Sequence, residues 1–319
     1  MTGIQRGFAV FALMALSCGA LAQFPNKPIK ILVPFAAGSA TDTITRILAG
    51  SVATAIGQPV VVEAKAGADG AIAAAEVAKA APDGYTLLMA TNSPLSAVPY
   101  LRKNPPYDAI ADFTPIADIG RYTFFIVVHP SLPVKTVAEL IDYARGNPGK
   151  ISYATGNTTG IASTAFFASQ AKIDMVHVPY RSEPQVIPDL LAGRVQLIFA
   201  SSSTTIAHIR EGKLRALATT LPRRSHLLPD LPTIAEAGMP QFSIVSWAGL
   251  FGPAKMPREV VERLNREFVA AAGRPEVQAL MEKQAFFLNP STPEQLAKLV
   301  KDQLEAYRAT LRAAGVQPE

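Results

Sequence analysis

The chain has 319 residues, of which 49% are hydrophobic and 17% are charged, and its formal net charge at pH 7 is +5. This length allows two globular domains, and this composition is not that of a disordered chain. The basic residues are scattered along the sequence, which gives a nucleic-acid-binding role little support and favours a small anionic ligand.

Residues 1–22 predict a secretory signal peptide. Arg6 precedes an apolar run over residues 7–16, and Ala20-Leu21-Ala22 has the small-x-small pattern of a cleavage site. The run is about half of the roughly 20 residues that span a bilayer, so we expect a soluble, exported protein. An alternative makes Cys18 a lipidated N-terminus. Cleavage after residue 22 removes this only cysteine, and the loss of Arg6 lowers the formal charge from +5 by one unit.

The chain from Lys27 onward alternates short apolar runs with longer helical patterns, which is typical of parallel βαβ units. The first strand begins at Ile29 and leads through a loop of small residues into a helix. Further strands are expected at 60–63 and 85–90, with a helix that ends at Ala80 between them.

Two apolar strands, 114–120 and 124–128, are expected to carry the chain from a first lobe into a second. The strand at 245–251, which includes Trp247, is expected to carry it back. The predicted boundaries are therefore 23–122 plus 246–319 for the first lobe and 123–245 for the second. Between the crossings the sequence predicts helices at 137–145, 160–171, 185–192 and 206–211 and strands at 150–154, 175–178, 195–200 and 214–219. Three C-terminal helices are expected at 257–272, 275–284 and, after a cap at Ser291, 292–313.

Two facing strand–helix loops are the candidate ligand site, because open α/β sheets bind ligands beyond the carboxyl ends of their strands. The loop at 38–42 directs backbone N–H groups and the positive end of a helix dipole at one point, which favours an anion. Asp42 can cap these amides, and its alternative role is an ordinary cap without ligand contact. The second loop, 155–160, is rich in hydroxyl groups.

The usual signatures of an enzyme are missing. The histidines His129, His177, His208 and His226 are widely spaced, without a partner at metal-ligand spacing. No G-x-S-x-G motif, complete dinucleotide fingerprint or phosphate-binding G-x-x-x-x-G-K-[ST] loop occurs. We therefore expect no catalytic residues, no metal and no cofactor.

Several sequence blocks along the chain together form a recognisable pattern. The blocks are Pro28-Ile29-Lys30-Ile31-Leu32-Val33-Pro34-Phe35-Ala36-Ala37-Gly38 with Asp42, Gly57-Gln58-Pro59-Val60-Val61-Val62-Glu63, Pro82-Asp83-Gly84-Tyr85-Thr86-Leu87-Leu88, Val178-Pro179-Tyr180, Gly212-Lys213-Leu214-Arg215-Ala216-Leu217-Ala218, Leu228-Pro229-Asp230-Leu231-Pro232-Thr233-Ile234-Ala235-Glu236-Ala237-Gly238 and Trp247-Ala248-Gly249. They resemble the receptors of tripartite tricarboxylate transporters, the Bug-type periplasmic solute-binding proteins. The resemblance covers essentially the whole mature chain.

This resemblance implies an α/β, two-lobed, type II-like periplasmic binding fold that closes on a small organic carboxylate, held largely by backbone amides and water. It implies membrane permease subunits as partners, and we expect a monomer. Alternatives are a secreted α/β enzyme that acts on a small carboxylic acid and a carboxylate sensor for a membrane signalling partner. The expected ligand-binding residues are Phe35, Ala36, Gly38, Ser39, Asp42, Ser93, Thr155, Asn157, Thr158, Thr159, Arg181 and Ser201.

The chain departs from the family pattern at positions that could affect the ligand. Ser39 stands in place of a second glycine, Gln196 in place of a common aspartate, and Tyr180-Arg181-Ser182 in place of Tyr-Lys-Gly. If these positions reach the cleft, the loss of an acid and the gain of Arg181 suit a more anionic ligand. We expect Arg181 to pair with a second acidic group of that ligand.

Overall fold

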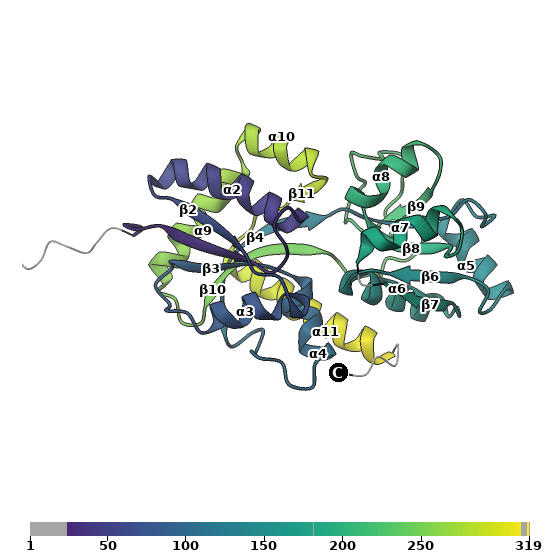
Figure 1. Ribbon diagram of the computed structural model, residues 1–319, viewed down its shortest axis with the longest axis horizontal. Coiled ribbons are helices and arrows are strands. Elements are labelled where there is room, and N and C mark those ends of the chain that lie inside the picture. The colour runs from purple at the N-terminus through teal and green to yellow at the C-terminus, as the bar shows by residue number, and fades with distance from the viewer. Residues whose placement is uncertain (1–23, 181, 314–317, 319) are drawn as a thin grey trace, which may run out of the picture.

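The computed structural model describes residues 24–180, 182–313 and 318. Two β-sheets with helices on both faces form two lobes that lie side by side (Figure 1). The strand order is β11-β4-β10-β3-β1-β2 in the first sheet and β7-β6-β8-β5-β9 in the second. The predicted signal peptide lies outside the described residues, and so does Arg181.

The first sheet is covered by α2, α9 and α10 on one face and by α3, α4 and α11 on the other (Figure 1). Its strands are β1 (Ile29–Val33), β2 (Val60–Ala64), β3 (Thr86–Thr91), β4 (Phe113–Tyr122), β10 (Trp247–Pro253) and β11 (Phe286–Leu288). Its helices are α2 (Ala40–Ile56), α3 (Ala71–Ala78), α4 (Val98–Leu101), α9 (Arg258–Ala272), α10 (Pro275–Lys283) and α11 (Pro293–Ala313), with short helical segments at η1 (Ala68–Gly70) and η2 (Ser93–Ala97).

The first strand shows why both faces of this sheet are covered. Side chains of a strand alternate between the two faces, so Ile29 and Ile31 enter the core under α2 and α9, whereas Leu32 enters the core under α3. All three are fully buried. A strand that is apolar on both faces needs a helical layer on each side.

The second sheet is built in the same way, with α5 and α6 on one face and α7 and α8 on the other. Its strands are β5 (Phe124–Val128), β6 (Ser152–Thr155), β7 (Val176–Pro179), β8 (Leu197–Ser201) and β9 (Arg215–Thr219). Its helices are α5 (Val137–Gly146), α6 (Thr158–Ala171), α7 (Glu183–Leu191) and α8 (Ser202–Arg210).

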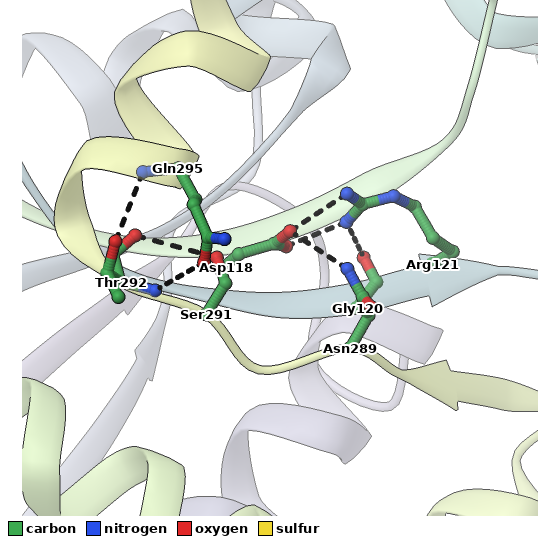
Figure 2. Close-up of polar contacts among 7 residues, drawn as sticks. All are labelled: Asp118, Gly120, Arg121, Asn289, Ser291, Thr292 and Gln295. Atoms are coloured by element: carbon green, nitrogen blue, oxygen red, sulfur yellow. Dashed lines mark hydrogen bonds and ion pairs between the residues drawn. The ribbon is translucent and has the colours of Figure 1, made fainter.

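The chain leaves the first sheet along β4 and enters the second at β5, and a buried ion pair anchors β4 just before this crossing (Figure 2). Arg121 contacts Asp118 through two bonds, Nη1 to Oδ1 at 2.7 Å and Nη2 to Oδ2 at 2.8 Å. The two side chains are only 12% and 4% exposed. Asp118 Oδ2 also accepts from Asn289 Nδ2 at 3.5 Å, and its backbone oxygen accepts from the N–H of Ser291. The pair thus joins β4 to the segment that leads into α11.

Gly120 lies between these two charged residues, and its missing side chain lets β11 approach β4. A Cβ at this position would lie 2.2 Å from the backbone oxygen of Phe287, and the φ of Gly120 is +158°. Beyond β11, Thr292 and Gln295 exchange side-chain and backbone hydrogen bonds as a capping box (Figure 2). The cap of α11 is therefore Thr292, not the predicted Ser291.

The structure corrects other details of the sequence prediction. The sheets are mixed, because β10 runs antiparallel to β3 and β4, and β5 runs antiparallel to β8 and β9. Helix α8 begins at Ser202, four residues before the predicted start at Ile206. Strand β11 and the helical segments over residues 93–101 were not predicted from the sequence. The proposed lobe boundaries stay a prediction.

Candidate functional site

A cavity of about 390 Å³ lies where the strand–helix junctions of the two sheets face each other. Its walls include residues that follow β1, β3, β6 and β8, and most of the lining side chains carry hydroxyl or amide groups. A larger hollow of about 940 Å³ is lined by residues around α5, β9 and positions 228–238, all from the second lobe. We take the smaller cavity as the candidate site, because both lobes contribute to it and it is large enough for a small molecule.

Most of the residues predicted for the site come together around this cavity. Those that line it are Phe35, Ser39, Ser93, Asn157, Thr158, Thr159 and Ser201. Ala36, Gly38, Asp42 and Thr155 lie beside it without forming its wall. Arg181 is outside the described residues, so its role stays a prediction.

The N-terminus of α2 forms part of the wall through Ser39, Ala40 and Thr41. Ser39 is the N-cap, and its Oγ accepts from the N–H of Asp42 at 3.2 Å. In any helix the N–H groups of the first turn have no intrahelical acceptor, so those of Ala40 and Thr41 are available to a ligand. The dipole of this 17-residue helix favours a negative charge at the same place.

Asp42 supports this loop from behind. Its Oδ2 accepts from the N–H of Gly38 at 2.9 Å and from Arg46 Nε at 2.9 Å. The hydrogen bond from Arg46 lowers the pKa of Asp42 most, and the Gly38 amide adds to this effect, against the opposing effect of burial. Asp42 therefore holds the turn at Gly38, whereas the cap that the sequence analysis assigned to it is made by Ser39.

The N-terminus of α6 lies on the opposite wall. Asn157 is the N-cap, and its Oδ1 accepts from the N–H of Gly160 at 2.7 Å. Thr158 and Thr159 then occupy the first turn, where their N–H groups also lack intrahelical acceptors. The two helices α2 and α6 thus direct their positive ends into the cavity from the two lobes.

Hydrogen bonds join the lobes at the edge of the cavity. Asn92, which is 2% exposed, donates from Nδ2 to Thr159 Oγ1 at 2.6 Å and to Tyr307 OH at 2.8 Å. Thr158 Oγ1 donates to Ser93 Oγ at 2.9 Å. Behind these bonds lies a small apolar cluster, in which Tyr307 and Leu311 of α11 pack with Ala162 of α6. The structure therefore has the two lobes in direct contact beside the cavity.

Glu183 is a cavity residue that the sequence analysis missed. It is the first residue of α7 and is 7% exposed. Its Oε1 accepts from the N–H of Ser201 at 2.8 Å, from Ser201 Oγ at 2.6 Å and from Thr204 Oγ1, and its Oε2 accepts from Asn157 Nδ2 at 2.7 Å. Burial raises the pKa of Glu183, and these hydrogen bonds oppose the rise.

Glu183 is the one side chain with a formal charge at pH 7 among the described residues that line the cavity. A ligand anion would therefore be held by backbone amides, hydroxyl groups and helix dipoles.

In residues 24–180 and 182–313, no cluster of three histidine, cysteine, aspartate or glutamate side chains offers a metal site. No helix in the described part of the chain is long and apolar enough to cross a bilayer.

The sequence is similar to those of known proteins. Residues 44–316 match the model of the tripartite tricarboxylate transporter family receptor. The chain is 36% identical to a UPF0065 protein in the tcbD-tcbE intergenic region of Pseudomonas sp. strain P51, over 96% of this chain and 93% of the relative. It is 31% identical to Protein BugT of Bordetella pertussis, over 92% of this chain and 91% of the relative.

The fold is also similar to that of solved structures. R. palustris Rpa4515 with adipate superposes with a TM-score of 0.79 and is 31% identical, over 93% of this chain and 100% of the other. The predicted α/β, two-lobed periplasmic binding fold is thereby confirmed.

Proposed function

Because the chain belongs to the tripartite tricarboxylate transporter family of receptors, we propose that it is a periplasmic solute-binding receptor that captures a small organic carboxylate between its two lobes. The observation that carries the proposal is the cavity of about 390 Å³, whose walls come from both lobes. A ligand held by both walls binds the closed arrangement best and shifts the protein toward it.

The carboxylate is placed between the N-termini of α2 and α6. The free N–H groups of Ala40, Thr41, Thr158 and Thr159 give it hydrogen-bond donors in a site that does not need a cationic side chain. The adipate named for the relative from R. palustris is a carboxylate of the size that this cavity admits. The hydroxyl groups of Ser39 and Ser93 add donors around the same point.

The remaining features of the proposal come from the sequence and from the family. The receptor would be exported by the signal peptide at residues 1–22, act as a monomer and deliver its ligand to the membrane permease subunits of a tripartite tricarboxylate-type transporter. The lobes would divide at residues 122/123 and 245/246, where the chain crosses between the sheets.

Native mass spectrometry of the protein purified from its own cells would test the proposal. We expect one carboxylate per chain, which is retained without conversion when the complex is incubated. A thermal shift should follow, because a ligand at a hundredfold excess over its Kd stabilises the native state by about 2.7 kcal/mol. Turnover of the acid would indicate the alternative enzyme, and co-purification with a signalling protein instead of a permease would indicate the sensor.

A backbone substitution would test the placement of the carboxylate. Ala40 is the first residue of α2, where proline is compatible with a helix, and the preceding Ser39 has the extended backbone that proline requires, with φ −65° and ψ 161°. Ala40→Pro removes one N–H donor and leaves the helix intact. We expect a loss of affinity of about tenfold or more.

Ala40→Val is the matched control, because it adds similar bulk and keeps the N–H group. Equal carboxylate affinities of Ala40→Pro and Ala40→Val in calorimetry would contradict the placement at α2.

A further inference from the structure

We propose that Glu183 selects the ligand by accepting a hydrogen bond from it, specifically from an ammonium group, at the part of the cavity wall that Glu183 and Ser201 form. The ligand class is then a small amino carboxylate. This inference rests on the proposed function, since it assumes that a carboxylate is held at α2 and α6.

The hydrogen bonds of Glu183 leave one oxygen with room for a ligand. Oε1 is surrounded by three donors, which are the N–H of Ser201, its hydroxyl group and the hydroxyl group of Thr204. Oε2 accepts only from Asn157 Nδ2 among the described residues. A carboxylate oxygen has two lone pairs, so Oε2 keeps one acceptor position while the side chain lines the cavity.

The charge of Glu183 decides what can occupy that position. Glu183 is the first residue of α7, and its Oε1 accepts from the N–H of Ser201, the N-cap of α8. The carboxylate of Glu183 therefore already lies at the positive ends of both helix dipoles. A second carboxylate of the ligand would meet a like charge in a largely buried site. An ammonium group would instead pair with the buried carboxylate of Glu183 and offset the free-energy cost of burying its charge.

This inference opposes the sequence-based expectation for Arg181. That expectation makes the second group of the ligand acidic, whereas the surroundings of Glu183 favour a cation. The hydrogen bonds that Glu183 accepts from Ser201, Thr204 and Asn157 favour its charged form, against the rise in pKa that burial causes. The ligand preference distinguishes these cases.

The first experiment uses the wild-type protein and a matched set of ligands. Straight-chain carboxylates with two to five methylene groups, each ending in an ammonium, a methyl or a second carboxylate group, are titrated by calorimetry. We expect the ammonium member to bind at least about tenfold more tightly than the dicarboxylate of the same length. A dicarboxylate that binds as tightly or more tightly at every length would overturn the inference and leave the proposed function standing. Failure of every carboxylate to bind would overturn both.

The second experiment changes Glu183 itself. Glu183→Gln keeps the shape and removes the charge, and we expect it to weaken binding of the preferred amino carboxylate about tenfold or more and to strengthen binding of the matched dicarboxylate. Glu211→Gln is the control, because it makes the same change of net charge at an exposed residue beyond the end of α8. If Glu183→Gln changes the affinities for the amino carboxylate and for the dicarboxylate in the same direction and by the same factor, the inference is overturned. If that variant does not fold, the wild-type ligand order still decides.

Discussion

The buried pair of Asp118 and Arg121 should contribute far more to stability than an exposed ion pair. In Asp118→Asn the guanidinium of Arg121, 12% exposed, loses its counter-charge and at least one of the bonds at 2.7 and 2.8 Å. Removing one partner of a buried ion pair lowers the free energy of unfolding by about 3–5 kcal/mol. We take the lower end, about 3 kcal/mol, because Arg121 keeps its bond to the backbone oxygen of Gly120. At roughly 2–4 °C per kcal/mol, the Tm should fall by about 6–12 °C.

Thermal unfolding by circular dichroism measures this loss against a matched control. Asp302→Asn breaks the i,i+4 ion pair with Lys298. The side chain of Asp302 is 54% exposed and that of Lys298 is 75% exposed. Exposed pairs contribute at most about 1 kcal/mol, so the control should lower the Tm by no more than about 4 °C. Similar Tm losses in the two variants would refute the reasoning that burial makes the Asp118 pair important.

Three further substitutions test single features of the fold and the site. Gly120→Ala should cost about 1–3 kcal/mol, measured by urea unfolding, because the new Cβ would lie 2.2 Å from the oxygen of Phe287; an unchanged midpoint would contradict this contact. Gly38→Val should weaken carboxylate binding and leave the overall fold intact. The φ of Gly38 is +80°, so a branched side chain distorts the turn even though no atom lies within 4 Å of the position of a Cβ. Unchanged affinity in calorimetry would contradict this expectation. The pKa of Asp42 is lowered from 3.8, chiefly by Arg46, so its contribution to stability is present above pH 3.8 and is lost as the pH falls through the folded-state pKa; Asp42→Asn should flatten the acid limb of a stability–pH curve, and an unaltered limb would argue against this contribution.

The strand–loop–helix junction at the start of the chain was predictable because local signals agree there. An apolar strand, a glycine and a helix with hydroxyl groups at its start point to the same structure, and the structure has β1 followed by the Ser39 cap of α2. The same agreement of local signals predicted the loop at Asn157. What failed is the choice between nearby capping residues, because Ser39 and Asp42 both suit the position and only the geometry decides.

Features that depend on contacts between distant segments could not be predicted. Strand β11 has three residues, and it exists because Gly120 lets Phe287 approach β4 from far along the chain. Glu183 has the appearance of an ordinary acid in the first turn of a helix. Its burial follows from the position of Ser201 and Thr204 at the start of α8, a helix whose first turn the sequence pattern did not reveal.

Small-angle X-ray scattering tests the central claim, that a carboxylate is gripped by both lobes, most directly. The ligand found by native mass spectrometry is removed by unfolding and refolding the protein, and scattering is recorded without ligand and at saturation. Because a ligand that contacts both α2 and α6 favours the closed arrangement, the radius of gyration should fall on binding. A radius of gyration that stays the same at saturation, with binding verified by calorimetry, would contradict capture between the two lobes.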